Sequence, residues 1–175
     1  MHITNIHQRT WPVTAEAVGA LLDTLSSPGD RLWPVSRWLP MTLDAGLCVG
    51  SRGGHGPVRY EVVRYVPGRE VVFEFDPDDG LLRGCHGTHA FYIAAEDGMA
   101  TLRHVIDMRA RLGAALRWAL FVRPMHDALL EDALDGVEAT LTGSVAKPTA
   151  WPWRVKYLRK LARRRRDVSP RGSAS

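Results

Sequence analysis

The strongest constraint on the fold is a change in the residue pattern near residue 110. Between Leu47 and Arg109 the chain consists of short runs rich in β-branched and aromatic residues, separated by turn residues. Such runs are typical of an antiparallel sheet, whereas alternating strands and helices would indicate a parallel one. From Leu112 to Leu141 apolar residues recur at helical spacing instead. We therefore expect a sheet whose apolar face is covered by one long helix.

Two hairpins are predicted within the β-rich part. Val58–Val66 and Val71–Phe75 flank a Pro-Gly turn, and His89–Ala95 and Ala100–Met108 flank a turn at Gly98. Neighbouring side chains of a strand point to opposite faces, so one sheet face should meet a core and the other water. In the strand predicted over Ala100–Met108 and continuing to Arg109, the expected core-facing residues are Leu102, Ile106 and Met108. The expected water-facing residues are Arg103, Asp107 and Arg109.

The regions on either side of the sheet also carry helix and strand signals. Ile3–Trp11 predicts a first strand, and Thr14 predicts the N-cap of a short helix. In the long helical segment Pro124 should produce a kink, because proline lacks an amide donor, and Gly143 should end the helix. Its expected core-facing positions are Leu116, Leu120, Leu130, Ala133, Val137 and Leu141.

Composition indicates one folded domain followed by a basic segment. The 175 residues are 45% hydrophobic and 24% charged, which is typical of globular proteins. The net charge of +4 is uneven: up to Ala146 there are 13 arginines against 18 acidic residues, and from Lys147 onward ten basic residues against Asp167. We expect a mildly acidic domain over residues 1–143, with no nucleic-acid-reading face, and a basic tail over residues 144–175.

Several protein classes are disfavoured. Two cysteines are too few for a disulfide framework or a four-cysteine zinc site. No apolar run reaches membrane-spanning length, and the first residues lack the pattern of a signal peptide. A cytoplasmic location is therefore expected.

A set of short motifs resembles the SRPBCC superfamily, which includes START, Bet v 1-like and polyketide cyclase proteins. The motifs are Leu32-Trp33-Pro34, Trp38-Leu39-Pro40, Gly53-Gly54-His55-Gly56-Pro57-Val58-Arg59-Tyr60, Pro67-Gly68-Arg69, Gly87-Thr88-His89 and Pro124-Met125-His126-Asp127. The resemblance covers Met1 to Gly143. It implies an α+β helix-grip (Bet v 1-like) fold, in which a curved antiparallel sheet wraps around a long C-terminal helix. It also implies an internal cavity for a lipid, polyketide or steroid-like molecule; we expect no cofactor and no metal ion.

Residues expected to contact such a ligand combine aromatic rings with polar groups. The glycine-rich segment Gly50–Gly56 lacks the ending and the following helix of a phosphate-binding loop, and is interpreted as a loop at the cavity mouth. The candidate ligand contacts are Trp33, His55, Arg59, Tyr60, Phe73, His89, His104, Trp118 and His126.

Two of these histidines are the candidate catalytic residues. His104 shares the apolar side of its strand, where it is either a hydrogen-bonded core residue or a cavity group. His126 follows Pro124, and its neighbours at helical spacing are apolar. If the two converge, one can remove a proton from a carbonyl compound while the other stabilises the enolate.

Other polar clusters have plainer interpretations. A zinc site of His86, His89 and Cys85 is disfavoured, because residues three apart on a strand point to opposite faces. The acidic positions of the long helix are interpreted as a solvated face in preference to a catalytic carboxylate pair. These positions are Asp127, Glu131, Asp132, Asp135 and Glu138.

The basic tail predicts an amphipathic helix over Trp151–Arg166, whose apolar side consists of Trp151, Val155, Leu158 and either Leu161 or Ala162. Such a helix is suited to an anionic membrane surface, which would place the protein at the inner face of the membrane. A solvated tail and a tail that binds nucleic acid or an acidic partner are the alternatives, and the segment after the helix is expected to be disordered. The candidate membrane contacts are Trp151, Trp153, Arg159, Lys160 and Arg163.

Three functions remain open from the sequence. The leading hypothesis is a binding or carrier protein for a hydrophobic small molecule. The second is a polyketide cyclase/dehydratase-type enzyme that uses His104 and His126 as general acid and base, and the third is an interaction adaptor with a vestigial pocket.

Overall fold

The computed structural model describes residues 1–78 and 80–168. In chain order its elements are β1 (His2–Trp11), α1 (Ala15–Leu22), β2 (Met41–Leu43), β3 (Arg52–His55), β4 (Val58–Val66), β5 (Glu70–Phe75), β6 (Cys85–Glu96), β7 (Met99–Ala110), α2 (Leu112–Arg117), the π-helical turn η1 (Trp118–Val122), α3 (Arg123–Thr142) and α4 (Trp153–Val168).

The strands form one antiparallel sheet in the order β1-β7-β6-β5-β4-β3-β2. Both predicted hairpins, β4–β5 and β6–β7, are confirmed, and β1 pairs along its length with β7. The predicted alternation on β7 is also confirmed. Leu102, Ile106 and Met108 are 1–2% exposed, whereas Arg103 lies on the opposite, solvent-facing side. We call the buried side of the sheet the inner face and the other the outer face.

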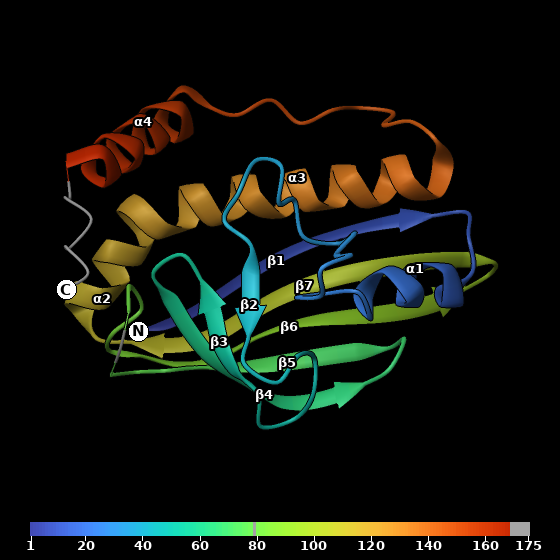
Figure 1. Ribbon diagram of the computed structural model, residues 1–175, viewed down its shortest axis with the longest axis horizontal. Coiled ribbons are helices and arrows are strands. Elements are labelled where there is room, and N and C mark those ends of the chain that lie inside the picture. The colour runs from blue at the N-terminus through green and yellow to red at the C-terminus, as the bar shows by residue number, and fades with distance from the viewer. Residues whose placement is uncertain (79, 169–175) are drawn as a thin grey trace, which may run out of the picture.

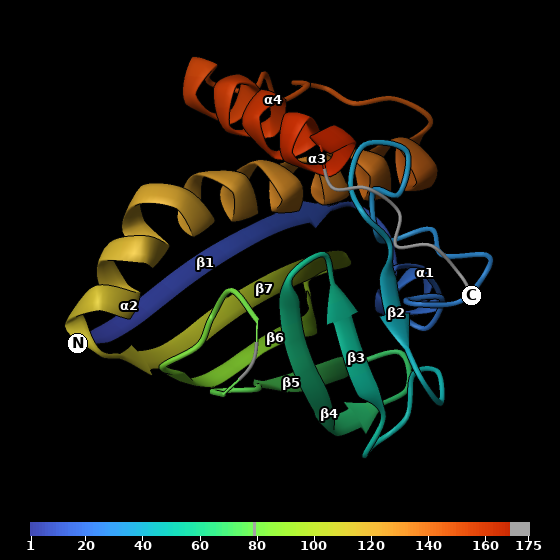
Figure 2. The ribbon, with the colours of Figure 1, turned by 60° about the vertical axis from the view of Figure 1, so that its left-hand side comes forward.

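Two helical layers lie above the inner face (Figures 1 and 2). The sheet bends beneath α3, which runs along the β1 edge, and α4 lies on the far side of α3. The short helix α1 begins at its predicted N-cap, where the Thr14 side chain accepts a hydrogen bond from the Ala17 amide. It packs against β6, β7 and α3, so the core is closed at that end of the sheet.

The long helical segment is interrupted by η1, directly before Pro124. A π turn inserts an extra residue into the helical repeat and rotates everything that precedes it. The prediction for the first half is therefore wrong: Leu116 and Leu120 are 54% and 50% exposed, and Trp118 is buried in their place. Leu130, Ala133 and Val137 are buried as predicted.

The glycine-rich segment also differs from its prediction, because Arg52–His55 is strand β3 and not a loop. It pairs with β2 on one side and β4 on the other. A Cβ atom on Gly53 would lie 1.9 Å from the Thr42 carbonyl oxygen, and one on Gly54 would lie 1.9 Å from that of Val58. The glycines thus allow close strand approach, and β3 carries His55 into the sheet.

Residues 144–152 return along α3 and lead into α4. The Ala146 amide donates to Glu138, the Thr149 amide donates to Asp135, and Val155 of α4 is 1% exposed. The tail predicted to follow the domain therefore packs on it up to α4, and the segment expected to be disordered lies largely outside the described residues. Among residues 1–78 and 80–168, none of the helices combines the length and apolar character needed to cross a bilayer.

Candidate functional site

Five histidines from five different elements meet on the inner face. His55 comes from β3, His89 from β6, His104 from β7, His126 from α3 and His7 from β1. The register explains part of this convergence, because His104 lies directly opposite His7 on one side and Phe91 on the other. Since alternate residues share a face, these strands deliver their rings to the same layer beneath α3.

The rings form a continuous series across the inner face. The ring centroids of His89 and His104 are 5.7 Å apart, and those of His104 and His126 are 5.0 Å apart, so the predicted convergence of the two candidate catalytic residues is present. The rings of His126 and His7 continue the series at 5.9 Å. Aromatic rings pack around these histidines: Trp33 against His55, Tyr60, Phe73 and Phe75 against His89, Phe91 against His104, and Trp118 against His126.

Three buried nitrogen atoms of this series have no hydrogen-bond partner. They are Nε2 of His89, Nδ1 of His104 and Nδ1 of His126. A buried polar atom left unpaired costs about 1–3 kcal/mol of folding free energy, and such atoms are uncommon in folded proteins. Aromatic rings with unpaired polar atoms among them provide the kinds of contact that bind an apolar molecule with a few hydrogen-bonding groups.

Burial keeps most of these imidazoles neutral. It lowers the pKa of His55 to about 3, with smaller contributions from the charges of His126 and Arg59. Burial likewise holds the pKa of His89 and of His104 well below the ordinary value. A neutral imidazole carries one donor and one acceptor nitrogen, so each of these rings can pair with either kind of ligand atom.

His7 has the opposite electrostatic environment. Its Nδ1 lies 2.8 Å from Glu131 Oε1, and its Nε2 lies 3.0 Å from Asp127 Oδ1. Burial alone would lower the pKa of His7, but these hydrogen bonds and charges outweigh it and raise the pKa. Burial would raise the pKa of Asp127, but the neighbouring His126, His7 and Asn5 hold it well below its usual range. The inner face thus ends, at the β1 edge, in a histidine hydrogen-bonded to two carboxylates, beside imidazoles whose pKa is lowered by burial.

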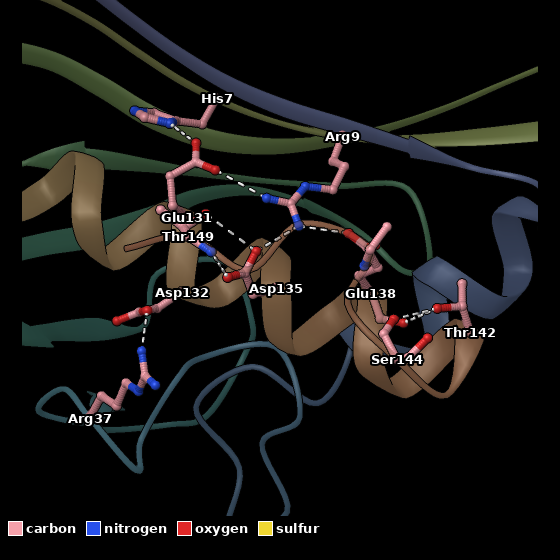
Figure 3. Close-up of polar contacts among 11 residues, drawn as sticks. His7, Arg9, Arg37, Glu131, Asp132, Asp135, Glu138, Thr142, Ser144 and Thr149 are labelled. Atoms are coloured by element: carbon pink, nitrogen blue, oxygen red, sulfur yellow. Dashed lines mark hydrogen bonds and ion pairs between the residues drawn. The ribbon is translucent and has the colours of Figure 1, made fainter. Parts of the chain in front are cut away.

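The acidic residues of α3 are not the solvated face that the sequence predicted (Figure 3). Arg9 of β1 contacts Glu131 at 3.1 Å and both Asp135 and Glu138 at 2.7 Å. With His7 it neutralises a row of carboxylates that would otherwise repel one another at four-residue spacing. The row therefore joins α3 to β1. Helical periodicity places these residues on one face but cannot show that a basic strand lies opposite.

Asp132, on another side of α3, is a buried hydrogen-bond acceptor for side chains from two other segments of the chain. It is 6% exposed and accepts hydrogen bonds from Arg37 Nη1 at 2.8 Å, Trp38 Nε1 at 2.6 Å and Trp151 Nε1 at 2.9 Å. The guanidinium carbon of Arg159 lies 4.3 Å from the ring centroids of both Trp38 and Trp151. Of the predicted membrane contacts, Trp151 and Arg159 thus pack against the domain, whereas Trp153 is 75% exposed and the Arg163 side chain lies outside the described residues.

Most predicted ligand contacts lie on the inner face, with one exception. Trp33, Tyr60, Phe73 and Trp118 are at most 4% exposed there. Arg59 is the exception: it is exposed on the outer face, where its Nη1 donates to the carbonyl oxygens of Gly56 and Val58. Strand alternation explains why Arg59 lies apart from the others, because Tyr60 next to it points inward.

Two further histidines bear on the site. His86, on the same strand as His89, is exposed and does not join the inner-face rings. His7 is absent from the predicted ligand contacts but belongs to the ring series. It alternates with Asn5 and Arg9 along the first strand, and three polar residues facing one way are a signal that the sequence does contain.

A hollow of about 430 Å³ lies on the outer face, opposite this series. It is lined by Gln8, Tyr92, Ala94, Thr101, Arg103 and Val105. Each strand that contributes to it also contributes an inner-face ring, since Tyr92 neighbours Phe91 and Arg103 neighbours His104. Neighbouring residues such as Arg103 and His104 therefore point to opposite faces, and substituting each of them separately shows on which face a ligand binds.

Comparison with solved structures identifies the architecture. CalU16 from Micromonospora echinospora, at 12% identity, covers 90% of this chain and 82% of its own with a TM-score of 0.53. Norcoclaurine synthase from Thalictrum flavum, at 10% identity, covers 81% and 88% with a TM-score of 0.61. A Thermobifida fusca protein, at 12% identity, covers 85% and 99% with a TM-score of 0.60.

The chain has the helix-grip fold. The predicted fold class is therefore confirmed: a curved antiparallel sheet of the Bet v 1 type, with a long helix across its inner face. By sequence, no family model and no curated protein matches the chain. One fold hosts many activities, so the function of this chain depends on the residues that its inner face carries.

Proposed function

We propose that this helix-grip protein, a member of the SRPBCC superfamily, binds a hydrophobic or amphipathic small molecule on the inner face of its sheet, as a binding or carrier protein. A lipid, polyketide or steroid-like molecule has the required chemistry. The supporting observation is the set of buried, unpartnered nitrogen atoms on His89, His104 and His126. The aromatic rings would contact the apolar body of the ligand, and the nitrogens its hydroxyl or carbonyl groups.

A solved neighbour supports the kind of ligand proposed. Norcoclaurine synthase from Thalictrum flavum has a structure in complex with dopamine and hydroxybenzaldehyde, at 8% identity and a TM-score of 0.58 to this chain. Both compounds combine an aromatic ring with polar substituents. The inner face of this chain offers aromatic rings and unpaired nitrogen atoms, which suit molecules of that kind.

Entry of a ligand requires movement of a covering element. His104 is 2% exposed and Phe91 is 1% exposed, so the inner-face rings are closed off from solvent. The segment that covers them includes η1, and π turns are irregular helical hydrogen-bonding arrangements that often occur at functional sites. We propose that α2 and η1 move away from the sheet to admit the ligand, with Trp118 carried along.

The test uses two adjacent residues of β7 that point to opposite faces. The full chain is purified from its own host and its bound small molecules are detected by native mass spectrometry. Progesterone and palmitate are then titrated into delipidated protein. We expect His104→Leu to weaken binding about tenfold, the equivalent of one hydrogen bond, and Arg103→Leu on the outer face to leave it unchanged. Loss of binding only in Arg103→Leu, or no binding by any form, would overturn the proposal.

A second candidate function is enzymatic turnover in the same place, as in polyketide cyclases and dehydratases. The observation that favours it is the 5.0 Å approach of His104 and His126, which allows two imidazoles to act on one carbonyl compound. Incubation with a poly-β-ketone thioester separates the two functions. An enzyme would give a cyclised or dehydrated product that His104→Leu abolishes, whereas a carrier would return the compound unchanged.

The outward side of α4 supports a further proposal, contact with an anionic membrane. Val155, expected to face the membrane, is 1% exposed, and Leu158 is half-buried. The outward stripe is Trp153, Tyr157 and Leu161, at 75%, 57% and 39% exposure. Exposed cationic residues flank it, namely Arg154, Lys156 and Lys160. An apolar stripe between positive charges complements the surface of a bilayer that contains anionic lipid.

Vesicle sedimentation tests the membrane proposal. Wild-type protein should sediment with vesicles of phosphatidylcholine and phosphatidylserine but not with phosphatidylcholine alone. A Trp153→Ser, Tyr157→Ser double variant should remain in the supernatant, and Tyr92→Ser, at an exposed aromatic residue of the outer face, should behave as wild type. Equal sedimentation of the double variant, or of any form with neutral vesicles, would contradict the proposal.

A further inference from the structure

We infer that His7, His126 and Asp127 form a binding site for a divalent transition-metal ion, of which Zn²⁺ fits best. One nitrogen or oxygen atom from each of these residues lies within 4.8 Å of the other two. The residues come from β1 and α3, two long elements held together by the Arg9 contacts with the acidic row. The metal site shares His126 with the small-molecule proposal but does not depend on it, because the unpaired nitrogens of His89 and His104 remain available to a ligand.

The distances are close to those of a coordination sphere. Asp127 Oδ1 lies 3.0 Å from His7 Nε2 and 3.9 Å from His126 Nδ1. In a tetrahedral site with bonds of about 2.1 Å, ligand atoms are separated by about 3.4 Å. The observed separations lie on either side of that value, so shifts of a few tenths of an ångström at each ligand would complete the site.

His126 contributes the observation that points to an ion. Its Nδ1 is buried and has no hydrogen-bond partner, although it faces the carboxylate of Asp127. At 3.9 Å the two atoms are too far apart for a hydrogen bond but suitably placed to share a cation. A metal ion would satisfy the nitrogen that the fold leaves unpaired.

His7 is oriented in the way that metal-bound histidines usually are. Its Nδ1 is paired at 2.8 Å with Glu131 Oε1, and Glu131 Oε2 accepts from Arg9 at 3.1 Å. A carboxylate that accepts from one ring nitrogen fixes the ring and directs the lone pair of the other nitrogen toward the metal. Here that second nitrogen is Nε2, which shares a proton with Asp127 Oδ1 at 3.0 Å in the absence of an ion and would release it on metal binding. Glu131 is therefore a positioning residue and not a ligand.

The donor set and its surroundings indicate the class of ion. Two imidazoles and one carboxylate suit zinc and neighbouring transition metals better than calcium or magnesium, which take oxygen ligands. Three protein ligands leave at least one coordination position open, as in catalytic zinc sites. Asp127, whose side chain is 36% exposed, gives an ion access from solvent, and His126 contacts His104 on the other side. An ion there would lie at the β1 end of the inner-face rings.

Metal titration of the full chain tests the site. Protein treated with a chelator and dialysed is titrated with Zn²⁺ by calorimetry and with Co²⁺ by visible absorption, which reports nitrogen and oxygen ligands directly. We expect one ion per chain. Asp127→Asn, which keeps the side-chain shape, and His126→Ala should each lower the affinity more than tenfold, and Glu131→Gln should lower it ten- to a hundredfold. His86→Ala, at an exposed histidine of β6, is the matched control and should bind as wild type.

Stability measurements distinguish the loss of a metal ligand from the loss of folding. Unfolding curves show whether each variant is folded. If His126→Ala is unstable, the affinity of Asp127→Asn alone tests whether the ion binds at this site. Absence of stoichiometric Co²⁺ absorption, or equal affinity in Asp127→Asn and wild type, would overturn the metal site. Native mass spectrometry of the chelator-treated protein measures small-molecule binding separately. A failure of metal binding therefore leaves the small-molecule proposal intact, and a failure of small-molecule binding leaves the metal site intact.

Discussion

Replacement of His104 by leucine should weaken ligand binding without destabilising the protein. His104 is 2% exposed and its Nδ1 has no partner, so the native fold already bears the cost of an unpaired buried nitrogen. That cost is about 1–3 kcal/mol. Leucine has a similar volume and removes the polar atom, although it also loses the ring contacts with Phe91 at 4.7 Å, His126 at 5.0 Å and His89 at 5.7 Å. Such contacts contribute about 0.5–1.5 kcal/mol each.

The two effects nearly cancel, so the free energy of unfolding of His104→Leu should lie within about 1 kcal/mol of the wild-type value. Urea unfolding followed by tryptophan fluorescence measures it. Asp132→Ala is the contrasting variant, because that buried carboxylate has three partners, and removal of one member of a buried charged network costs about 3–5 kcal/mol. If His104→Leu loses as much as Asp132→Ala, His104 is a structural residue and the reasoning is refuted.

Three further outcomes follow from the described contacts. Burial lowers the pKa of His55 to about 3. Between pH 6.5 and 3 the unfolded chain therefore binds a proton that the native state does not, and the free energy of unfolding decreases as the pH is lowered. Urea unfolding should show that His55 lowers the free energy of unfolding by about 2 kcal/mol between pH 7 and 5, and the free energy of His55→Phe should depend less on pH. The same pH dependence in wild type and His55→Phe would be evidence against the lowered pKa. Arg9→Met should destabilise the protein by about 2 kcal/mol because three carboxylates lose their cation, while Arg52→Met, at an exposed pair, should change the unfolding free energy by less than about 0.5 kcal/mol. Asp132→Asn should loosen residues 144–152 and α4, seen as faster limited proteolysis within that segment than in wild type; unchanged cleavage would show that the Asp132 contacts do not hold it.

Local patterns were sufficient for the framework of the fold. The two hairpins, the N-cap at Thr14 and the inward side of β7 follow from turn residues and from a repeat of two. His104 and His126 could be paired in advance for the same reason, since each lies on an apolar side of its own element. These features depend on neighbours in the sequence, which composition and periodicity report directly.

The errors arose where distant residues decide the outcome. The π turn shifts the phase of the helix before Pro124, so Leu116 and Leu120 are exposed although their spacing is helical. The acidic row of α3 has the pattern of a solvated face because its cations, His7 and Arg9, lie more than a hundred residues earlier in the chain. Glycines that signal a loop by composition form β3, since two neighbouring strands approach too closely for any side chain.

The most direct test of the central claim is the ¹⁵N spectrum of the histidine side chains, recorded on delipidated protein before and after addition of progesterone or palmitate. Imidazole nitrogens report hydrogen bonding and tautomeric state. If the ligand occupies the inner face, the resonances of His89 and His104 should shift while that of exposed His86 stays in place. Unshifted His89 and His104 resonances with either compound bound, together with changes in the backbone amides of Tyr92 and Arg103, would place the ligand in the outer hollow and contradict the account.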